Sequence, residues 1–118
     1  MQRNSVKRDA ILKKICSTKS HPTAEWVYGE LKGEFPDLSL GTVYRNIAEF
    51  KSAGKLVSVG VVAGKDRLDG CVSEHSHFIC DACHAVIDID IAPRPLAIDA
   101  GRAERMNLSI HGTCRNCL

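Results

Sequence analysis

The sequence has no apolar run long enough to cross a membrane, and residues 1–4 lack the hydrophobic stretch that opens a signal peptide. We therefore expect a cytoplasmic protein with no membrane partner. The chain is also short, because 118 residues form one compact unit or two very small ones. A core of that size gains stability from a bound metal ion, and the chain is short for an enclosed substrate pocket.

The small net charge of +2 hides a difference between the two halves of the chain. Residues 1–58 carry ten Lys and Arg against six Asp and Glu, whereas residues 59–118 carry six against eight. A basic first half and an acidic second half rich in metal ligands indicate nucleic-acid contact followed by a regulatory module.

Four of the six cysteines form two CxxC pairs, Cys80 with Cys83 and Cys114 with Cys117. In a reducing cytoplasm this spacing is typical of zinc ligands and not of disulfides. Two such turns complete a tetrahedral shell of four thiolates that leaves no open position, so we predict a structural Zn2+ site. The two remaining cysteines are expected to be small, buried apolar residues; they are Cys16 and Cys71.

A second kind of metal ligand stands just before the first CxxC pair, in His75-Ser76-His77. Side chains in a strand repeat with period two, so both imidazoles would lie on one face. Further ligands would have to come from elsewhere in the chain, and such a site can sense or catalyse.

The first 70 residues have the pattern of three short helices and a hairpin. We expect helices from about residue 4 or 5 to before Ser17, from a cap at Thr23 until Gly33 and Pro36, and from a cap at Ser39 to Gly54. In the third helix, Val43, Ile47 and Phe50 form an apolar stripe. A β-branched strand over 56–62, a turn over 63–66 and a return over 67–69 complete a winged helix-turn-helix.

From about residue 71 the pattern changes to strands, expected over 76–79, 86–91 and 108–111. Residues 96–106 could form a short helix, although Gly101 weakens it. We therefore place a domain boundary between residues 70 and 71.

The second helix of a helix-turn-helix lies in the major groove, so its outward residues decide which bases are read. Arg45 suits guanine or a phosphate, Asn46 suits adenine, and the Tyr44 ring suits a thymine methyl. Thr42 lies on the same outward face. Four basic side chains outside this helix are suited to phosphate contacts; these are Lys7, Arg8, Lys65 and Arg67.

Several motifs follow one another in an order and spacing that resemble the ferric uptake regulator family of metal-dependent repressors. They are His21-Pro22-Thr23-Ala24-Glu25, the run from Ser39 to Ile47, Gly64 with Arg67-Leu68-Asp69, and the run from His75 to Cys80 with Cys83. The likeness covers about residues 3–92 and resumes at the closing CxxC pair. It implies a homodimer that binds palindromic, double-stranded operator DNA.

The expected fold is accordingly α+β. An N-terminal winged helix-turn-helix occupies residues 1–70, and a small, shortened α/β dimerisation domain with a four-cysteine zinc site occupies residues 71–118. The resemblance places a regulatory metal between the two domains. Because residues 93–113 are few for the long helix and strand pair of relatives, the strength of the dimer is in question.

The resemblance also implies the ligands of the regulatory metal. They are His21 from the DNA-binding domain, Asp69 at the hinge, and His75, His77 and Asp88 from the second domain. Three imidazoles and two carboxylates suit Fe2+ or Mn2+ better than a soft ion. Asp90 stands two residues after Asp88, faces the same side of its strand and could substitute for it.

An aspartate five residues after the second zinc cysteine resembles the peroxide-sensing repressors of the family, in which Fe2+ reacts with hydrogen peroxide and a ligand imidazole is oxidised. We therefore expect a peroxide-stress repressor. An iron-responsive or zinc-responsive repressor of the same family is the alternative. His84 departs from the family pattern, because relatives usually have glycine there, and its imidazole could compete as a zinc ligand.

Three other classes of protein remain open from the residues alone, although we expect no enzyme. An HxH with two aspartates could hold a hydrolytic metal, but no general base is placed beside a substrate pocket. A CxxC pair could be redox-active, but a thioredoxin-type site needs one CxxC that opens a helix. A zinc-ribbon interaction module would have the same cysteines and no affinity for DNA.

Overall fold

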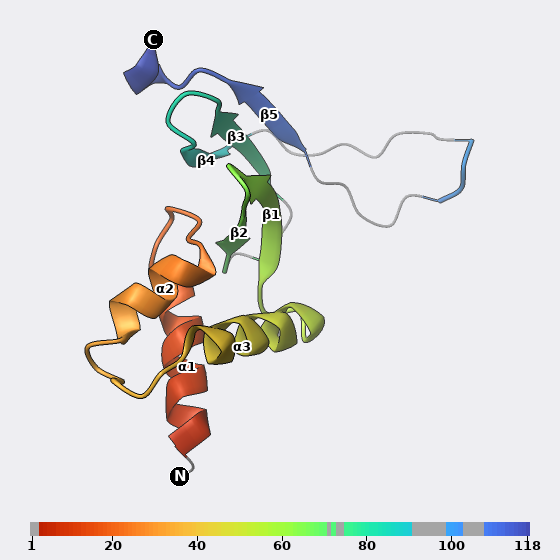
Figure 1. Ribbon diagram of the computed structural model, residues 1–118. Helices are drawn as coiled ribbons and strands as arrows, with labels where there is room; N and C mark the ends of the chain where they lie inside the picture. Colours follow the sequence, from red (N-terminus) through yellow and green to blue (C-terminus); the bar gives the residue numbers. More distant parts are fainter. Residues whose placement is uncertain (1–2, 71, 73–74, 91–98, 103–107) are drawn as a thin grey trace. The chain divides into compact units, whose positions relative to one another are not determined.

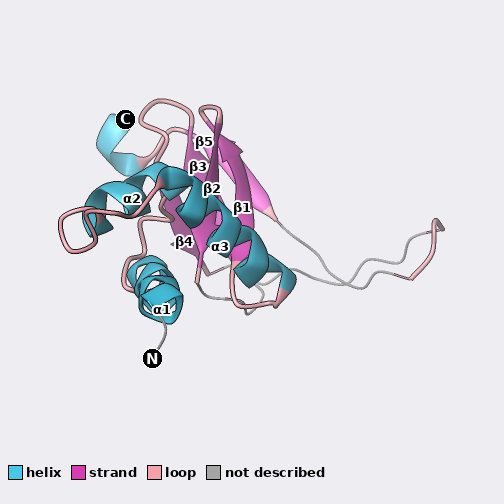
Figure 2. Ribbon diagram, turned by 60° about the horizontal axis from the view of Figure 1, so that its bottom comes forward, coloured by secondary structure: helices cyan, strands magenta, loops and turns pink. Residues whose placement is uncertain are grey.

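The computed structural model describes residues 3–70, 72, 75–90, 99–102 and 108–118 (Figure 1). The chain divides into two compact units, Met1–Val72 and Ser73–Leu118. In the described residues, helices are confined to the first unit apart from a short 3-10 turn near the C-terminus, and both units contain strands, so the fold is α+β (Figure 2). None of the described helices combines the length and the apolar character that a membrane span needs.

Three helices open the first unit: α1 (Arg3–Cys16), α2 (Ala24–Leu31) and α3 (Leu40–Ser52). The caps predicted for α2 and α3 are confirmed, because Thr23 Oγ1 accepts from the Trp26 N–H and Ser39 Oγ accepts from the Thr42 N–H, both at 3.1 Å. After α3, Gly54 adopts a left-handed conformation with φ of 75°. A side chain would be strained there, which explains the glycine.

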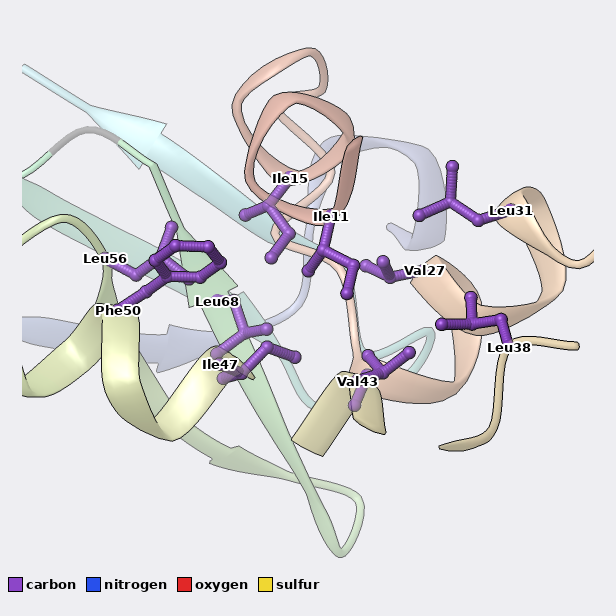
Figure 3. Packing of buried hydrophobic residues seen from close by; sticks show 11 residues of the cluster. Ile11, Ile15, Val27, Leu31, Leu38, Val43, Ile47, Phe50, Leu56 and Leu68 are labelled. Carbon is purple, nitrogen blue, oxygen red and sulfur yellow. The ribbon is translucent and has the colours of Figure 1, made fainter. Parts of the chain in front are cut away.

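The core of the first unit lies between the three helices and the hairpin that follows them (Figure 3). The stripe predicted for α3 is confirmed, because Val43, Ile47 and Phe50 are all buried. They pack with apolar side chains from the rest of the unit, namely Ile11, Ile15, Val27, Leu31, Leu38, Leu56 and Leu68. This single core fixes α3 against α1 and α2, and thereby fixes which of its residues face outward.

A two-stranded antiparallel hairpin completes the first unit, formed by β1 (Val57–Val62) and β2 (Lys65–Asp69). The predicted turn over residues 63–66 is wrong in length, since Val62 pairs directly with Lys65. Ala63 and Gly64 alone make the turn, with φ of 52° and 81°. Two consecutive positive φ angles form the tight turn whose twist matches that of paired strands. Lys65 therefore begins β2 at the tip of the hairpin.

The second unit is a three-stranded sheet of β3 (Ser76–Cys80), β4 (Val86–Ile89) and β5 (Ser109–Gly112), followed by the 3-10 helix η1 (Arg115–Cys117). The central strand β3 pairs antiparallel with β4 and parallel with β5. Gly112 at the end of β5 packs closely on the Phe78 ring, because a Cβ there would lie 3.3 Å from it. Of the helix predicted over 96–106, residues 99–102 form a turn and no helix, and the rest lies outside the described residues.

Cys16 is exposed, which corrects the prediction that it is buried. It is the last residue of α1 and follows the buried Ile15, so it points about 100° away from the inward stripe of the helix. A Cβ on Gly70 would lie only 2.6 Å from Cys16 Sγ, which leaves no room for any other residue at position 70. Cys71 lies outside the described residues.

Candidate metal centres and nucleic-acid interface

The four paired cysteines come together in the second unit. Cys80 ends β3, and the parallel pairing of β3 with β5 brings Gly112, and hence the second CxxC pair, alongside it. Their four Sγ atoms all lie within 4.8 Å of one another; they belong to Cys80, Cys83, Cys114 and Cys117. The Sγ atoms of Cys83 and Cys114 are 3.7 Å apart. A tetrahedron with Zn–S bonds of about 2.3 Å has edges of about 3.8 Å, so the spacing fits Zn2+.

The cluster needs a cation to hold four thiolates. Cys80 Sγ accepts the backbone N–H groups of Cys114 at 3.3 Å and Cys83 at 3.4 Å, and these bonds lower the pKa of Cys80 to about 6. In contrast, hydrogen bonds with Cys114 and Cys83 raise the pKa of the Cys117 thiol to about 12. The backbone thus favours the thiolate form of Cys80, whereas the Cys117 thiol keeps its proton unless a bound cation displaces it.

His84 closes the first CxxC turn in a left-handed conformation with φ of 63°, and its N–H bonds the Cys80 carbonyl at 2.9 Å. This conformation costs a residue with a Cβ about 1–2 kcal/mol, which explains why glycine suits the position better. The sequence interpretation allowed His84 to compete as a zinc ligand. Among the described residues, however, the group that could hold one ion consists of the four cysteines and does not include His84.

Two of the predicted regulatory ligands pair within the first unit. His21 and Asp69 are buried, with 2% and 8% of their surface exposed, and His21 Nε2 lies 3.3 Å from Asp69 Oδ2. β2 positions both residues, because Asp69 ends the strand and the Leu68 N–H donates to the Pro22 carbonyl at 3.0 Å. His21 has a φ of 57°. Non-glycine residues in this region are strained and occur at functional sites.

Arg67 holds the loop that carries His21. Its guanidinium donates to the backbone carbonyls of His21 and of Ser20, the latter at 2.7 Å. The sequence interpretation assigned Arg67 to DNA phosphates, but the side chain is turned inward and partly buried. Arg67 is therefore a structural residue of the loop before α2.

The other three predicted ligands meet in the second unit. His75 Nε2 and His77 Nε2 lie 3.2 and 3.3 Å from the same oxygen of Asp88, Oδ1. The strand register explains this meeting, because His77 on β3 is directly opposite Asp88 on β4. The alternative ligand Asp90 lies just beyond the end of β4, and both aspartates are exposed. The contacts of Asp88 with the two imidazoles therefore favour Asp88 over Asp90, which the sequence pattern could not do.

The residues predicted to read bases lie in different environments on α3. Tyr44 and Arg45 are exposed, and Thr42 is half-buried. Asn46 is instead engaged inside the unit, because its Nδ2 donates to the Thr42 carbonyl at 3.0 Å and its Oδ1 accepts from Arg8 at 3.2 Å. The surface of α3 therefore presents Tyr44 and Arg45, and Asn46 joins α3 to α1.

The residues predicted to contact phosphates also lie in different environments. Lys65 is exposed and pairs with Glu25 at 3.1 Å, whereas the Lys7 side chain is only 16% exposed and pairs with Asp37 at 3.0 Å. Arg8 lies with its guanidinium 4.5 Å from the centre of the Phe50 ring and pairs with Glu49. Arg8 therefore joins α1 to α3, and its side chain is 34% exposed.

Glu25 is a residue that sequence reasoning missed. It lies in the first turn of α2 and accepts a hydrogen bond from the Tyr44 hydroxyl at 2.8 Å. This bond lowers the pKa of the Glu25 carboxyl and raises the pKa of the Tyr44 phenol. An acidic residue in a first helical turn is ordinary in sequence, because it favours the helix dipole, and nothing in the pattern signals its contact with Tyr44.

Comparison with protein families matches residues 2–112 to the model described as the ferric uptake regulator family. The chain is 29% identical over 116 residues to the peroxide operon regulator of Bacillus subtilis (strain 168), with 93% of this chain and 80% of the relative covered. It is 30% identical over 118 residues to the peroxide-responsive repressor PerR of Staphylococcus aureus (strain USA300), with 93% and 78% covered.

Solved structures share the fold. The peroxide stress regulator of Campylobacter jejuni superposes with a TM-score of 0.76 at 23% identity, with 98% of this chain and 91% of that chain covered. At this identity the likeness shows the arrangement of helices and strands and does not by itself assign ligands or partners.

Proposed function

Because the chain belongs to the ferric uptake regulator family, we propose that it is a metal-dependent transcriptional repressor that binds operator DNA and senses peroxide. The observation that carries the proposal is the division of the candidate ligands. Each compact unit holds a part of one His and Asp set, two residues in the first and three in the second. The relatives named as a peroxide operon regulator and as a peroxide-responsive repressor support the choice of stimulus.

The four-cysteine cluster is proposed to hold a structural Zn2+. Four thiolates at tetrahedral spacing leave no position for a substrate, and the cluster joins the first CxxC turn to the C-terminal residues. The ion stabilises the sheet of the second unit, because it fixes β5 and the segment after it against β3.

The regulatory ion is proposed to take ligands from both units. The shell would consist of three imidazoles and two carboxylates, from His21, Asp69, His75, His77 and Asp88. This donor set suits Fe2+ or Mn2+. An ion that needs ligands from both units favours the arrangement that brings them together, and it regulates DNA binding if that arrangement fits the operator.

The first unit is proposed to be the DNA-binding domain, a winged helix-turn-helix in which α3 enters the major groove. Tyr44 and Arg45 would read bases, with Thr42 at the edge of the contact, and Lys7 and Lys65 would exchange their carboxylate partners for phosphates. The second unit, from about residue 71, is proposed to form the homodimer that matches a palindromic operator.

Peroxide sensing is proposed to occur at the imidazole ligands. Bound Fe2+ would activate hydrogen peroxide for cleavage of its O–O bond. One oxygen atom of the peroxide would enter a ring C–H bond of His21 or His75, the imidazole would supply the two electrons, and the other oxygen atom would leave as water. The oxidised imidazole is a poorer ligand, so the two units lose their shared ion and the protein leaves its operator.

The test compares metal-free, Fe2+-loaded and Mn2+-loaded protein on a duplex that the loaded protein enriches from a random pool, with and without hydrogen peroxide. Both metals should activate binding, and peroxide should release only the Fe2+-loaded protein. Peptide mass analysis should then find one added oxygen on His21 or His75. Release without histidine oxidation would contradict the peroxide mechanism, and metal-independent binding would contradict the regulatory site.

A further inference from the structure

A carboxylate lies among the residues that we propose to meet DNA. Glu25 Oε1 accepts the Tyr44 hydroxyl at 2.8 Å, and its other oxygen, Oε2, lies 3.1 Å from Lys65 Nζ. Tyr44 belongs to α3, Lys65 begins β2 at the tip of the hairpin, and Glu25 belongs to α2. One side chain thus ties three elements of the unit together at the surface.

This carboxylate opposes general affinity for nucleic acid. It neutralises Lys65, which would otherwise contact phosphates, and it repels phosphates itself. A contribution of Glu25 to DNA binding must therefore come from its contact with Tyr44. The Tyr44 side chain is 50% exposed, so the hydrogen bond to Glu25 restrains its hydroxyl where burial does not. A restrained ring loses less conformational freedom when it meets a base edge.

A second carboxylate in the same cleft provides a comparison. A cleft of about 460 Å³ between α2, α3 and the hairpin is lined by Glu25, Tyr44 and Lys65, and also by Lys51 and Asp66. Asp66 pairs with Lys51 and accepts the Ser58 hydroxyl. Both acidic residues carry the same charge and each pairs with a lysine, but Glu25 is the one bonded to Tyr44.

We propose that Glu25 is a specificity-determining residue, which holds Tyr44 and Lys65 in one arrangement before DNA is bound. To contact a phosphate, Lys65 must leave its ion pair with Glu25. On an unrelated DNA sequence, Tyr44 finds no matching base to offset this cost, so binding is weak. On the operator, the positioned ring contacts its base, and Lys65 can move to a phosphate. The inference rests on the proposed DNA-binding function and adds to it a residue that lowers affinity in order to increase discrimination.

The test uses full-length, Mn2+-loaded wild type, Glu25→Ala and Asp66→Asn, with unchanged zinc content and thermal unfolding as the check of folding. Each is titrated with the duplex selected by wild type and with a scrambled duplex of the same composition. Glu25→Ala should bind the scrambled duplex about five- to tenfold more tightly near 0.1 M salt, because freeing Lys65 releases about one further counterion. Its preference for the selected duplex should fall about tenfold or more.

Asp66→Asn is the matched control, because it removes the same charge from the same cleft without touching Tyr44. It should raise affinity for both duplexes alike and preserve their ratio. Tyr44→Phe should lose the same preference as Glu25→Ala, and the double variant should lose no more than either single variant, since both changes remove the hydrogen bond between Tyr44 and Glu25.

Two results would overturn the inference while leaving the proposed function in place. One is a Glu25→Ala protein that keeps the wild-type preference, and the other is a loss of preference that Asp66→Asn shares in full. A wild-type protein that binds neither duplex, or both equally, would instead overturn the proposed function together with the inference.

Discussion

The two groups of candidate ligands differ in how the chain holds them. The four cysteines of the two CxxC pairs belong to the second unit, where a strand pairing and two tight turns bring their sulfur atoms within 4.8 Å of one another. The histidines and aspartates are divided, with His21 and Asp69 in one unit and His75, His77 and Asp88 in the other. A group completed by local structure can stabilise a fold, whereas a group completed only by two bodies can report their arrangement.

The largest effect is expected when the cysteine cluster is broken. Cys114→Ser should release the zinc and unfold the second unit, because structural zinc contributes about 10 kcal/mol or more of folding free energy in small domains. Zinc content and circular dichroism measure this. Cys16→Ser is the control, since Cys16 is exposed and lies outside the cluster. A folded, zinc-bearing Cys114→Ser protein would show that the cluster is not a structural site.

Mutation of a His or Asp ligand should affect metal regulation and not folding. His21→Ala should keep the zinc and the fold, yet lose the effect of Mn2+ on operator affinity, which for coupled sites is about 5- to 150-fold. The reason is that only the contribution of the first unit to the ion is removed. Mobility shifts with and without Mn2+ measure the coupling, with the exposed His111→Ala as the control. Unaltered metal activation would place the regulatory ion elsewhere.

Strand register makes a sharper prediction within the second unit. Asp88→Asn should weaken Mn2+ binding by about tenfold or more, since even the loss of an outer hydrogen-bonding partner costs about 10–100-fold. Asp90→Asn, two residues further along the chain, should bind Mn2+ as wild type does. Competition with a fluorescent chelator gives both affinities. Equal losses in the two variants would mean that register does not select the ligand.

The smallest effect concerns the turn of the cysteine cluster. His84→Gly should stabilise the second unit by about 0.5–1 kcal/mol, because relief of about 1–2 kcal/mol of left-handed strain exceeds the added entropy of the unfolded chain. Ala82→Gly, in the same turn but without a positive φ, should destabilise it by about 0.4–1 kcal/mol. Chemical denaturation of the zinc-loaded protein compares them. A destabilised His84→Gly protein would indicate that the imidazole contributes to the cluster.

Several elements could be predicted from local patterns alone. The caps Thr23 and Ser39 and the stripe of Val43, Ile47 and Phe50 are confirmed, because capping and helical periodicity act over only a few residues. The hairpin turn was placed correctly but made two residues too long, since the sequence does not reveal that Ala63 adopts a positive φ. The exposure of Cys16 was also missed, because burial depends on the helices packed around α1.

The candidate sites show the same division between local and distant information. By itself, the sequence determined the ligand types and the two CxxC turns, because metal chemistry depends on side-chain identity and short spacing. Only the tertiary structure decided that Asp88 meets both histidines, that Asn46 and Arg67 form hydrogen bonds within the first unit, and that Glu25 holds Tyr44. These outcomes depend on strand register and on contacts between elements distant in the chain, which follow from the packing of the whole unit.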